Sequence, residues 1–336
     1  MKPPMNGSRG KSSSLLNDSR VASMAQQLWS IQQASFKDAW LTIGTYDGVH
    51  IGHQKIIQGL AAGAKADGAP AIVVTFHPHP AAVTRQLGGP HLLSMPEERA
   101  EYLHDAGADV VITQPFDQQI AGTNAEDFLV LLKKHLGFRH LWVGYDFALG
   151  HKRGGDIQRL HELAEQLDYQ LQVVPAVQIN GQIVSSSRIR GMLREGRVAN
   201  AAQALSRWYK LSGTVVKGDG RGRTLGFPTA NLAIPVEKFI PESGVYACIA
   251  RVGDIERAAA VNIGLRPTFD GSSATTQIEA HILDFKGNLY GQEMSLSFIE
   301  RLRDEKGFPS IQALIDQIQQ DISQTRELVT LIKSPG

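Results

Sequence analysis

Residues 41–53 read Leu41-Thr-Ile-Gly-Thr-Tyr-Asp-Gly-Val-His-Ile-Gly-His53. The first four of these residues predict a buried strand, and a helix is expected to open at Gly52 or His53, so that Asp47 to His50 form the turn between them. Such a turn points backbone N–H groups and the positive end of a helix at a bound anion. The stretch therefore predicts an α/β fold with a phosphate-binding turn after its first strand.

The alternation of strand and helix continues to about Gln172. Apolar runs predict further strands at 72–76, 110–113, 141–145 and 171–174, and helical spacing predicts helices at 53–65, 96–106, 125–136 and 155–167. Thr123 and Glu126 predict a capping box for the third of these helices, which Gly137 closes. Apolar strands that alternate with helices predict a Rossmann-like parallel sheet covered on both faces, with ligands at the carboxyl ends of its strands.

The pattern changes near Trp208, after a predicted helix over 187–205. Short strand-like segments follow, at 211–216, 244–252, 258–263, 277–283 and 294–298, and they predict a small antiparallel β-barrel. The chain then ends in an amphipathic helix predicted over 310–332. We therefore predict an α/β domain over 37–206 and an all-β domain over 207–334. Residues 1–36 are expected to be disordered or loosely attached, with Met24 as an alternative start.

Composition restricts the class of protein. The chain has 336 residues, of which 42% are hydrophobic, a size that favours two domains. Its 34 Lys and Arg against 33 Asp and Glu give a net charge of +1, so nucleic acid is not expected as a partner. We find no apolar stretch that approaches the length of a membrane span and no secretory signal, and the sole cysteine, Cys248, is expected in a buried strand. A cytoplasmic protein without a membrane partner is predicted, and its oligomeric state is left open.

The two histidines of the turn, His50 and His53, flank Gly52. Imidazoles in this position can donate hydrogen bonds to the charge that develops on phosphorus during phosphoryl or nucleotidyl transfer. The same spacing on its own could also bind a metal or merely pack. Its place between the first strand and the first helix favours a phosphate site.

This segment resembles the His-x-Gly-His motif of the nucleotidyltransferase superfamily, in the form found in bacterial FMN adenylyltransferase domains. Three later segments resemble motifs of the same family: Thr75-Phe-His-Pro-His-Pro80, Val143-Gly-Tyr-Asp-Phe-Ala-Leu-Gly150 and Val184-Ser-Ser-Ser-Arg-Ile-Arg190. The resemblance implies catalytic histidines at His50 and His53. It implies that ATP binds at Gly44, Asp47, Gly48, His50, Gly52, His53, Ser185, Ser186 and Arg188, and that FMN binds near His77, Pro78, Asp146 and Phe147. Cytidylyltransferases and pantetheine-phosphate adenylyltransferases share the histidine motif and are the alternatives.

A second signature lies in the β-rich half. The glycine-rich stretch 217–226 lacks the Gly-Lys-Ser/Thr ending of a Walker loop, and by composition alone it would be a hairpin loop. The next segment, Phe227-Pro-Thr-Ala-Asn-Leu232, places Thr229 and Asn231 two residues apart in an extended chain, hence on one side of it. Their hydroxyl and carboxamide oxygens are suitable ligands for Mg²⁺.

Together these segments resemble the signature of riboflavin kinase, and the similarity continues in order through 241–246, 262–268, 278–285, 289–291 and 298–303. The resemblance implies that Glu279 is the general base and that Thr229 and Asn231 hold Mg²⁺. It implies that ATP binds at Gly222, Arg223, Gly226, Pro228, Thr229 and Asn231, and that the flavin binds near Asn262 and Arg303.

The two resemblances together predict a bifunctional bacterial riboflavin kinase and FMN adenylyltransferase. Its small-molecule partners would be riboflavin, ATP, FMN and FAD. Two alternatives keep the same fold: the barrel could serve as a binding module, or only one half could be active. The joint presence of Thr229, Asn231 and Glu279 argues against a binding module, because such a module has no need for a base.

Overall fold

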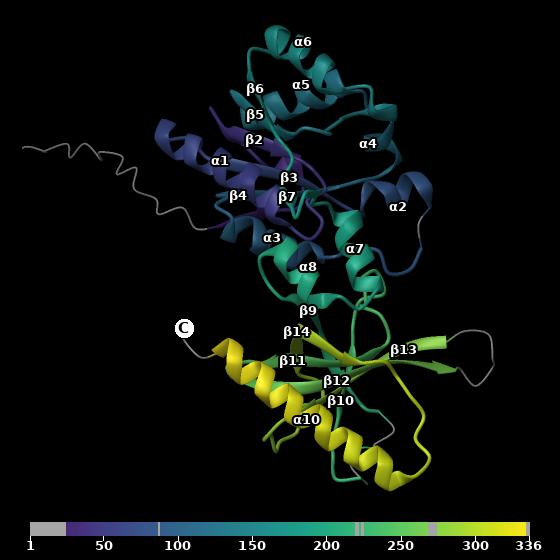
Figure 1. The fold of residues 1–336 in the computed structure, drawn as a ribbon. Helices are drawn as coiled ribbons and strands as arrows, with labels where there is room; N and C mark the ends of the chain where they lie inside the picture. The colour runs from purple at the N-terminus through teal and green to yellow at the C-terminus, as the bar shows by residue number, and fades with distance from the viewer. Residues whose placement is uncertain (1–24, 87, 219–221, 223–224, 268–273, 334–336) are drawn as a thin grey trace, which may run out of the picture.

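The computed structural model describes residues 25–86, 88–218, 222, 225–267 and 274–333. Figure 1 shows an α/β part above a β-barrel, with the long C-terminal helix lying along the barrel. The predicted combination of an α/β fold with a small β-barrel is confirmed. No helix in the described ranges is long and apolar enough to cross a membrane.

The α/β part is built on a sheet with the strand order β1-β4-β3-β2-β5-β6, in which every neighbouring pair is parallel. Its strands are β1 (Gln26–Leu28), β2 (Trp40–Ile43), β3 (Ala71–His77), β4 (Val110–Pro115), β5 (His140–Gly144) and β6 (Gln170–Val174). Its helices are α1 (Ile51–Asp67), α2 (Pro80–Arg85), α3 (Pro96–Asp105), α4 (Gln118–Gly122), α5 (Ala125–Leu136) and α6 (Ile157–Leu167), with the 3-10 turns η1 (Ile31–Gln33) and η2 (His151–Arg153). Residues of α1 and α3 pack on one face of the sheet, and residues of α5 and α6 pack on the other.

The stretch before β2 differs from the expected loose tail. Residues 1–24 lie outside the described residues, but β1 adds a parallel edge strand beside β4. Ile31 is fully buried in the core, and its backbone N–H donates to Gln114 Oε1 at 2.8 Å. Leu28 and Phe36 pack against the same core, so residues 25–36 are part of the fold.

The predicted capping box of α5 is wrong. The residue that caps the helix is Asn124, whose Oδ1 accepts a hydrogen bond from the backbone N–H of Asp127 at 2.8 Å. Thr123 ends the preceding short helix α4 instead, and its hydroxyl donates to Gln119 O. Thr123 and Asn124 are both suitable N-cap residues. Asn124 caps α5 because Thr123 already belongs to the end of α4, a helix that the sequence pattern did not reveal. Gly137 closes α5 in the left-handed conformation as predicted.

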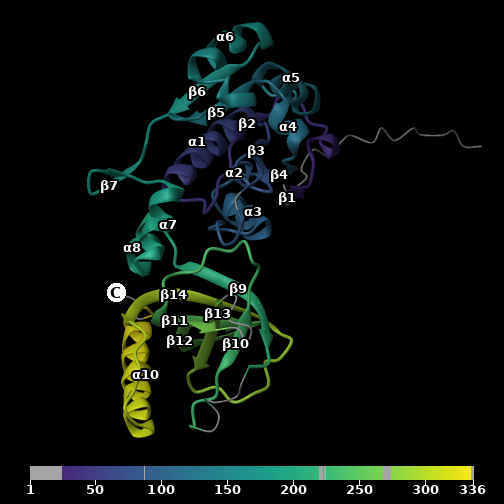
Figure 2. The ribbon, with the colours of Figure 1, turned by 90° about the vertical axis from the view of Figure 1, so that its right-hand side faces the viewer.

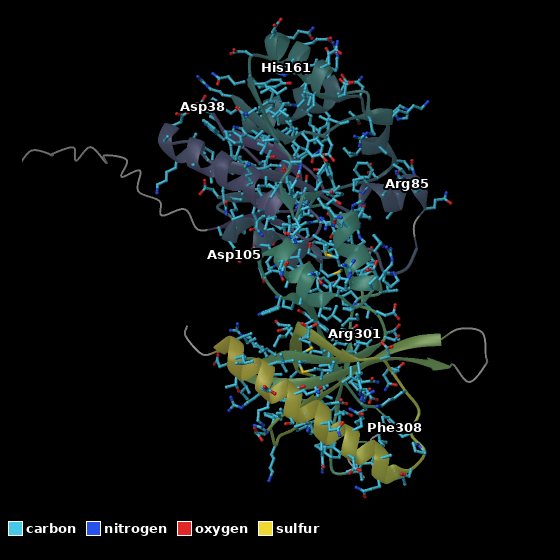
Figure 3. All side chains as sticks on the ribbon, viewed as in Figure 1. Asp38, Arg85, Asp105, His161, Arg301 and Phe308 are labelled. Atoms are coloured by element: carbon cyan, nitrogen blue, oxygen red, sulfur yellow. The ribbon has the colours of Figure 1, made fainter. Side chains whose placement is uncertain are left out.

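A hairpin of β7 (Gln178–Ile179) and β8 (Gln182–Ile183) leads into two helices where one was predicted, α7 (Ser186–Arg194) and α8 (Val198–Leu205). The break lies at Gly196, whose φ of 69° is left-handed. A Cβ atom there would lie 2.4 Å from Arg301 Cδ, so the glycine also lets the barrel approach the turn. Figure 2 shows α7 and α8 between the sheet and the barrel, and Figure 3 labels Arg301 at that junction.

The second half is a closed barrel with the strand order β10-β13-β12-β11-β14-β9, in which every pairing that is described is antiparallel. Its strands are β9 (Tyr209–Val216), β10 (Ala230–Ala233), β11 (Gly244–Val252), β12 (Ile255–Pro267), β13 (Ala274–Ile282) and β14 (Glu293–Arg303). Helix α10 (Ile311–Lys333) packs against β11 and β12. Cys248 is fully buried in β11, as predicted.

The two parts share hydrophobic packing and a backbone connection. One core cluster contains side chains of α7 and α8 together with the barrel interior, so these helices pack with the barrel as well as with the sheet domain. Segment 91–93 pairs with 237–239: the backbone N–H groups of His91 and Leu92 donate to Glu237 O, and that of Phe239 donates to Leu92 O. Lys238 is buried beside Glu98, with 2.5 Å between Nζ and Oε2. The segment before α3 is thus fixed by the barrel.

Candidate active sites

The first site forms where β2 turns into α1. His50 is the N-cap of α1, and the backbone N–H of His53 donates to His50 Nδ1 at 3.4 Å. The two imidazoles stack with their centroids 3.6 Å apart, and the rings of Tyr46 and His53 are nearly perpendicular to each other, with their centroids 5.0 Å apart. Since Nδ1 of His50 accepts a hydrogen bond, the neutral ring carries its proton on Nε2. That N–H is the donor that His50 can offer to a ligand.

Burial keeps both rings uncharged at neutral pH. Desolvation lowers the pKa of His50 from 6.5 to about 4, and Asp47 only partly opposes this shift. Desolvation also lowers the pKa of His53 well below 6.5, with further contributions from His50, Arg207 and Arg99. The pair therefore provides neutral hydrogen-bond donors, and the fixed positive end of α1 supplies the favourable field for an anion.

The glycines of the turn are required by its local geometry. Gly48 has a φ of 80°, and a Cβ there would lie 2.9 Å from Leu93 Cδ1. At Gly52 a Cβ would meet Cε1 of the His50 ring at 3.1 Å, and at Gly44 it would meet the ring of Tyr46 at 2.9 Å. The missing side chains thus let the aromatic rings lie against the backbone. Whether the same space admits a triphosphate stays a prediction.

Asp47 of the turn points its side chain into the protein interior. Its carboxylate is fully buried and accepts hydrogen bonds from the backbone N–H groups of Leu93 and Ser94. It also forms an ion pair with Arg190 of α7, at 2.6 Å between Oδ2 and Nη2. Both oxygens are engaged by protein groups, so the structure favours a role in holding the turn over the predicted contact with ATP.

The N-terminus of α7 reaches the same turn. Ser186 Oγ donates to Asp47 O at 2.8 Å, which brings this predicted residue to the start of the turn that precedes His50. Ser185 caps α7 through a bond from the backbone N–H of Arg188. The Arg188 guanidinium instead donates to Gln182 O at 3.1 Å. Together with Ser185 it lines a cavity of about 210 Å³ beside the β7–β8 hairpin, and His50 and His53 are not among the residues that line this cavity.

The residues predicted for FMN follow β3 and β5, whose carboxyl ends lie at the same edge of the parallel sheet as the end of β2. His77 ends β3, is followed by a cis bond to Pro78, and has a buried Nδ1 without a partner within the described part of the chain. Asp146 is exposed beyond β5, and Phe147 packs partly against the core. The structure therefore places these predicted residues at the expected edge.

Sequence reasoning missed Arg99 of α3. Its side chain is fully buried, and its two terminal nitrogens donate to Thr45 O and Phe76 O, each at 2.9 Å. Thr45 lies in the turn after β2, and Phe76 lies near the end of β3, just before His77, so one guanidinium links the turn of the histidine pair to the strand end near the predicted FMN site. The available signal was an arginine four residues before Leu103, on the apolar face of a predicted helix.

The second site is a row of polar residues across three strands of the barrel. Asn231 of β10 pairs with Glu279 of β13, and Glu279 pairs with Asn262 of β12. Cross-strand partners in an antiparallel sheet lie about 5 Å apart at Cβ and point to the same face. Three residues predicted from separate segments, with the roles of metal ligand, base and flavin contact, are thereby brought together.

Neighbouring residues hold the side chains of this row in place through hydrogen bonds and close packing. Gln277 Nε2 donates to Asn231 Oδ1 at 2.5 Å and to Glu279 Oε1 at 2.9 Å. Gly218 covers the carboxamide so closely that a Cβ there would lie 2.0 Å from Asn231 Nδ2. Asn262 Nδ2 donates to Glu305 Oε1 at 3.3 Å. Gln277, which the sequence analysis missed, thus links the predicted base to the predicted metal ligand.

The glycine-rich loop is described only in part. Arg223 lies outside the described residues, whereas the carbonyl of Gly222 accepts bonds from the backbone N–H groups of Leu225 and Phe227. Gly226 has a φ of 88°. Pro228 O contacts His281 Nδ1 at 2.9 Å, which ties the end of the loop to β13 two residues beyond Glu279.

Arg303, predicted to bind flavin, is already paired. Its guanidinium forms a two-pronged ion pair with the buried Asp321 of α10, and Nη1 donates to Asp304 O. The ring of Phe308 lies 5.7 Å from the same guanidinium. Arg303 therefore fastens α10 to the end of β14, and a flavin contact stays a prediction.

The donor set of the second site fits a hard cation. The predicted ligands Thr229 and Asn231 carry a hydroxyl and a carboxamide oxygen, both of the class that Mg²⁺ prefers. Within the described residues no group of three or more His, Cys, Asp or Glu could hold a metal. A cation here would keep most of its ligands as water or substrate phosphate, which is the usual state of Mg²⁺ in phosphoryl transfer.

A parallel sheet with neutral imidazoles at a helix N-terminus can bind and polarise a nucleotide. A barrel that aligns a carboxylate with oxygen ligands can activate an alcohol. The combination defines a two-domain, ATP-dependent transferase.

Comparison with known proteins narrows this class. The FAD synthetase family model matches residues 32–188, and the riboflavin kinase family model matches residues 205–329. The bifunctional riboflavin kinase/FMN adenylyltransferase of Escherichia coli K12 is 34% identical over 307 residues, covering 90% of this chain and 97% of its own. That of Listeria monocytogenes is 32% identical and covers 85% and 91%.

A solved structure from Streptococcus pneumoniae, described as a macrolide-efflux protein, aligns with a TM-score of 0.80 and 27% identity over 89% of this chain and 98% of its own. The two-domain arrangement is therefore shared with a solved structure. The chain belongs to the bifunctional riboflavin kinase/FMN adenylyltransferase family.

Proposed function

We propose that the barrel phosphorylates riboflavin to FMN and that the α/β domain joins FMN to the adenylyl group of ATP, giving FAD and pyrophosphate. The observation that carries the proposal is that the two family matches fall on two structural domains, each with its own site. The adenylyltransferase domain, predicted over 37–206, would also include residues 25–36, which pack with its sheet, and the kinase domain would span 207–334. The lone buried Cys248 agrees with a reducing, cytoplasmic location.

In the kinase reaction, Glu279 would accept the proton of the ribityl 5′-hydroxyl as that oxygen attacks the γ-phosphorus of ATP. A positioned base of this kind contributes about 10²- to 10⁴-fold. Gln277 Nε2 donates to Glu279 Oε1 at 2.9 Å, which helps to hold the carboxylate in place. Mg²⁺ on Thr229 and Asn231 would neutralise phosphate charge. The segment around Gly222 and Gly226 would lie over ATP, and Asn262 would contact the flavin.

In the adenylyl transfer, the phosphate of FMN would attack the α-phosphorus of a second ATP, and pyrophosphate would leave. His50 Nε2–H, His53 and the N–H groups that open α1 would stabilise the charge that develops on the phosphoryl oxygens. Ser186 would hold the turn against α7, and Arg188 would turn from the β7–β8 hairpin to the phosphates when ATP binds. His77 and Asp146 would contact FMN. No covalent enzyme intermediate is required.

One assay tests both halves. Pure protein is incubated with riboflavin, Mg²⁺ and ATP, and FMN and FAD are followed by chromatography. Glu279→Gln should abolish FMN formation but still convert added FMN to FAD, and His50→Ala should do the opposite. A lack of FMN from the wild type would refute the kinase assignment. Loss of both reactions in either folded variant would refute the division of residues between the sites.

A further inference from the structure

We propose that Arg207 is a positioning residue for adenylyl transfer, which holds the His50 turn from the segment that leads into the barrel. This inference rests on the proposed function of the α/β domain. Arg207 lies just before β9, inside the segment that the riboflavin kinase model matches and beyond the segment that the FAD synthetase model matches. A residue of the kinase side would thus complete the adenylyltransferase site.

The contacts of Arg207 converge on the turn. Nη2 donates to Gly48 O at 2.5 Å, and Nη1 donates to Val49 O and to Leu205 O, each at 3.1 Å. The guanidinium lies 3.6 Å from the centroid of the Tyr102 ring. Stacking on one face and hydrogen bonds along the edge fix the plane of the group, a geometry that lysine cannot reproduce.

The turn needs such support. Gly48 has a φ of 80°, and Val49, which is β-branched, has a φ of 37°. A β-branched residue in the left-handed region is strained, and such a residue persists only where its surroundings hold it. Gln54 Nε2 donates to the same Val49 carbonyl at 2.8 Å, so that two side chains fix this peptide group.

Fixing the Val49 carbonyl also fixes the backbone N–H of His50. The two groups share one peptide plane, and in a trans peptide they point in opposite directions. With the carbonyl held by Arg207 and Gln54, the His50 N–H points away from them, as one of the N–H groups that open α1. Arg207 thereby orients both the histidine backbone and the first amide available to an anion.

The charge of Arg207 acts on the same residues. It lowers the pKa of His50, which Asp47 raises, and it lowers the pKa of His53, as His50 and Arg99 of α3 also do. Loss of the guanidinium should therefore raise the pKa of both imidazoles as well as loosen the turn. Lysine would keep the charge and lose the fixed geometry, so the two effects can be separated.

The test compares Arg207→Ala and Arg207→Lys with the wild type, using kcat and KM for FAD formation, FMN formation by the same chain, and the pH profile of each reaction. Arg159→Ala is the matched control, because it removes two exposed ion pairs of the α/β domain away from the turn. We expect Arg207→Ala to lower kcat/KM for FAD formation roughly 10- to 100-fold while FMN formation stays unchanged. In the pH profile of FAD formation by Arg207→Ala, the acid limb should move to higher pH. Arg207→Lys should return this acid limb to its wild-type position without restoring the rate of FAD formation.

The outcomes are distinct. A rate for Arg207→Ala within about twofold of the Arg159→Ala control would overturn the inference while FAD formation by the wild type upholds the proposed function. Equal losses of FMN and FAD formation with an unmoved acid limb would assign Arg207 to general stability and overturn it as well. If Arg207→Ala does not fold, the same comparison is made with Arg207→Lys, and a rate of FAD formation within about twofold of the Arg159→Ala control would overturn the inference. A wild type that forms no FAD would refute the proposed function itself.

Discussion

Lys238→Met removes the cation that joins the barrel to the α/β domain. The Lys238 side chain is only 2% exposed, and its Nζ contacts Glu98 Oε2 at 2.5 Å and Leu93 O at 3.0 Å. The change would leave the Glu98 carboxylate, whose side chain is 11% exposed, without its cation. Breaking a buried ion pair from one side costs about 3–5 kcal/mol, so we expect the first unfolding transition to shift by roughly 6–20 °C.

The assay is thermal unfolding followed by circular dichroism, with FAD and FMN formation measured on the same samples. Leu93 donates its backbone N–H to Asp47, so loss of Lys238 should also lower FAD formation more than FMN formation. Adding Glu98→Gln removes the stranded charge and should recover part of the lost stability. A shift of Lys238→Met below about 2 °C would show that the pair contributes nothing measurable. A double variant no more stable than Lys238→Met would refute the stranded charge as the cause.

Three further predictions concern the sites and the N-terminal strand. Because burial lowers the pKa of His50 from 6.5 to about 4, the rate of FAD formation should stay constant down to about pH 5. The free energy of unfolding should fall as the pH is lowered from 6.5 to about 4, because only the unfolded chain takes up this proton in that range. A rate of FAD formation that already declines near pH 6.5 would contradict this prediction. Gly218→Ala should displace the Asn231 carboxamide, since the new Cβ would lie 2.0 Å from Nδ2. FMN formation should slow at least tenfold, while added FMN is still converted to FAD. Equal rates of FMN formation in wild type and variant would show that the alanine side chain does not disturb Asn231. Ile31→Ala empties a fully buried position and should cost about 2–5 kcal/mol in denaturant unfolding, whereas an effect below about 0.5 kcal/mol would mean that the stretch before β2 is loosely attached after all.

Local pattern explains which parts of the fold could be predicted. Strands and helices follow from the spacing of apolar residues, because backbone geometry fixes the period of each. The core strands of the sheet and most strands of the barrel could therefore be placed from the sequence. The edge strand β1 was not predicted, and β10 was expected only as an extended segment, because strand pairing depends on a distant partner. The helix break at Gly196 was also missed, although a glycine in the left-handed conformation is typical of a helix end.

The sites divide in the same way. The sequence by itself placed His50 in the turn and His53 at the start of the first helix after a buried strand, and it carried the resemblance that names the flavin substrates. It did not reveal the cross-strand row of Asn231, Glu279 and Asn262, which depends on how the barrel closes.

Only the tertiary structure shows that the buried Asp47 carboxylate accepts hydrogen bonds from the backbone of Leu93 and Ser94. Only the tertiary structure shows that Arg207 donates to the carbonyls of Gly48 and Val49. The physical reason is that a residue type and its spacing fix local conformation, whereas the partner of a buried charge is chosen by packing among segments far apart in the chain.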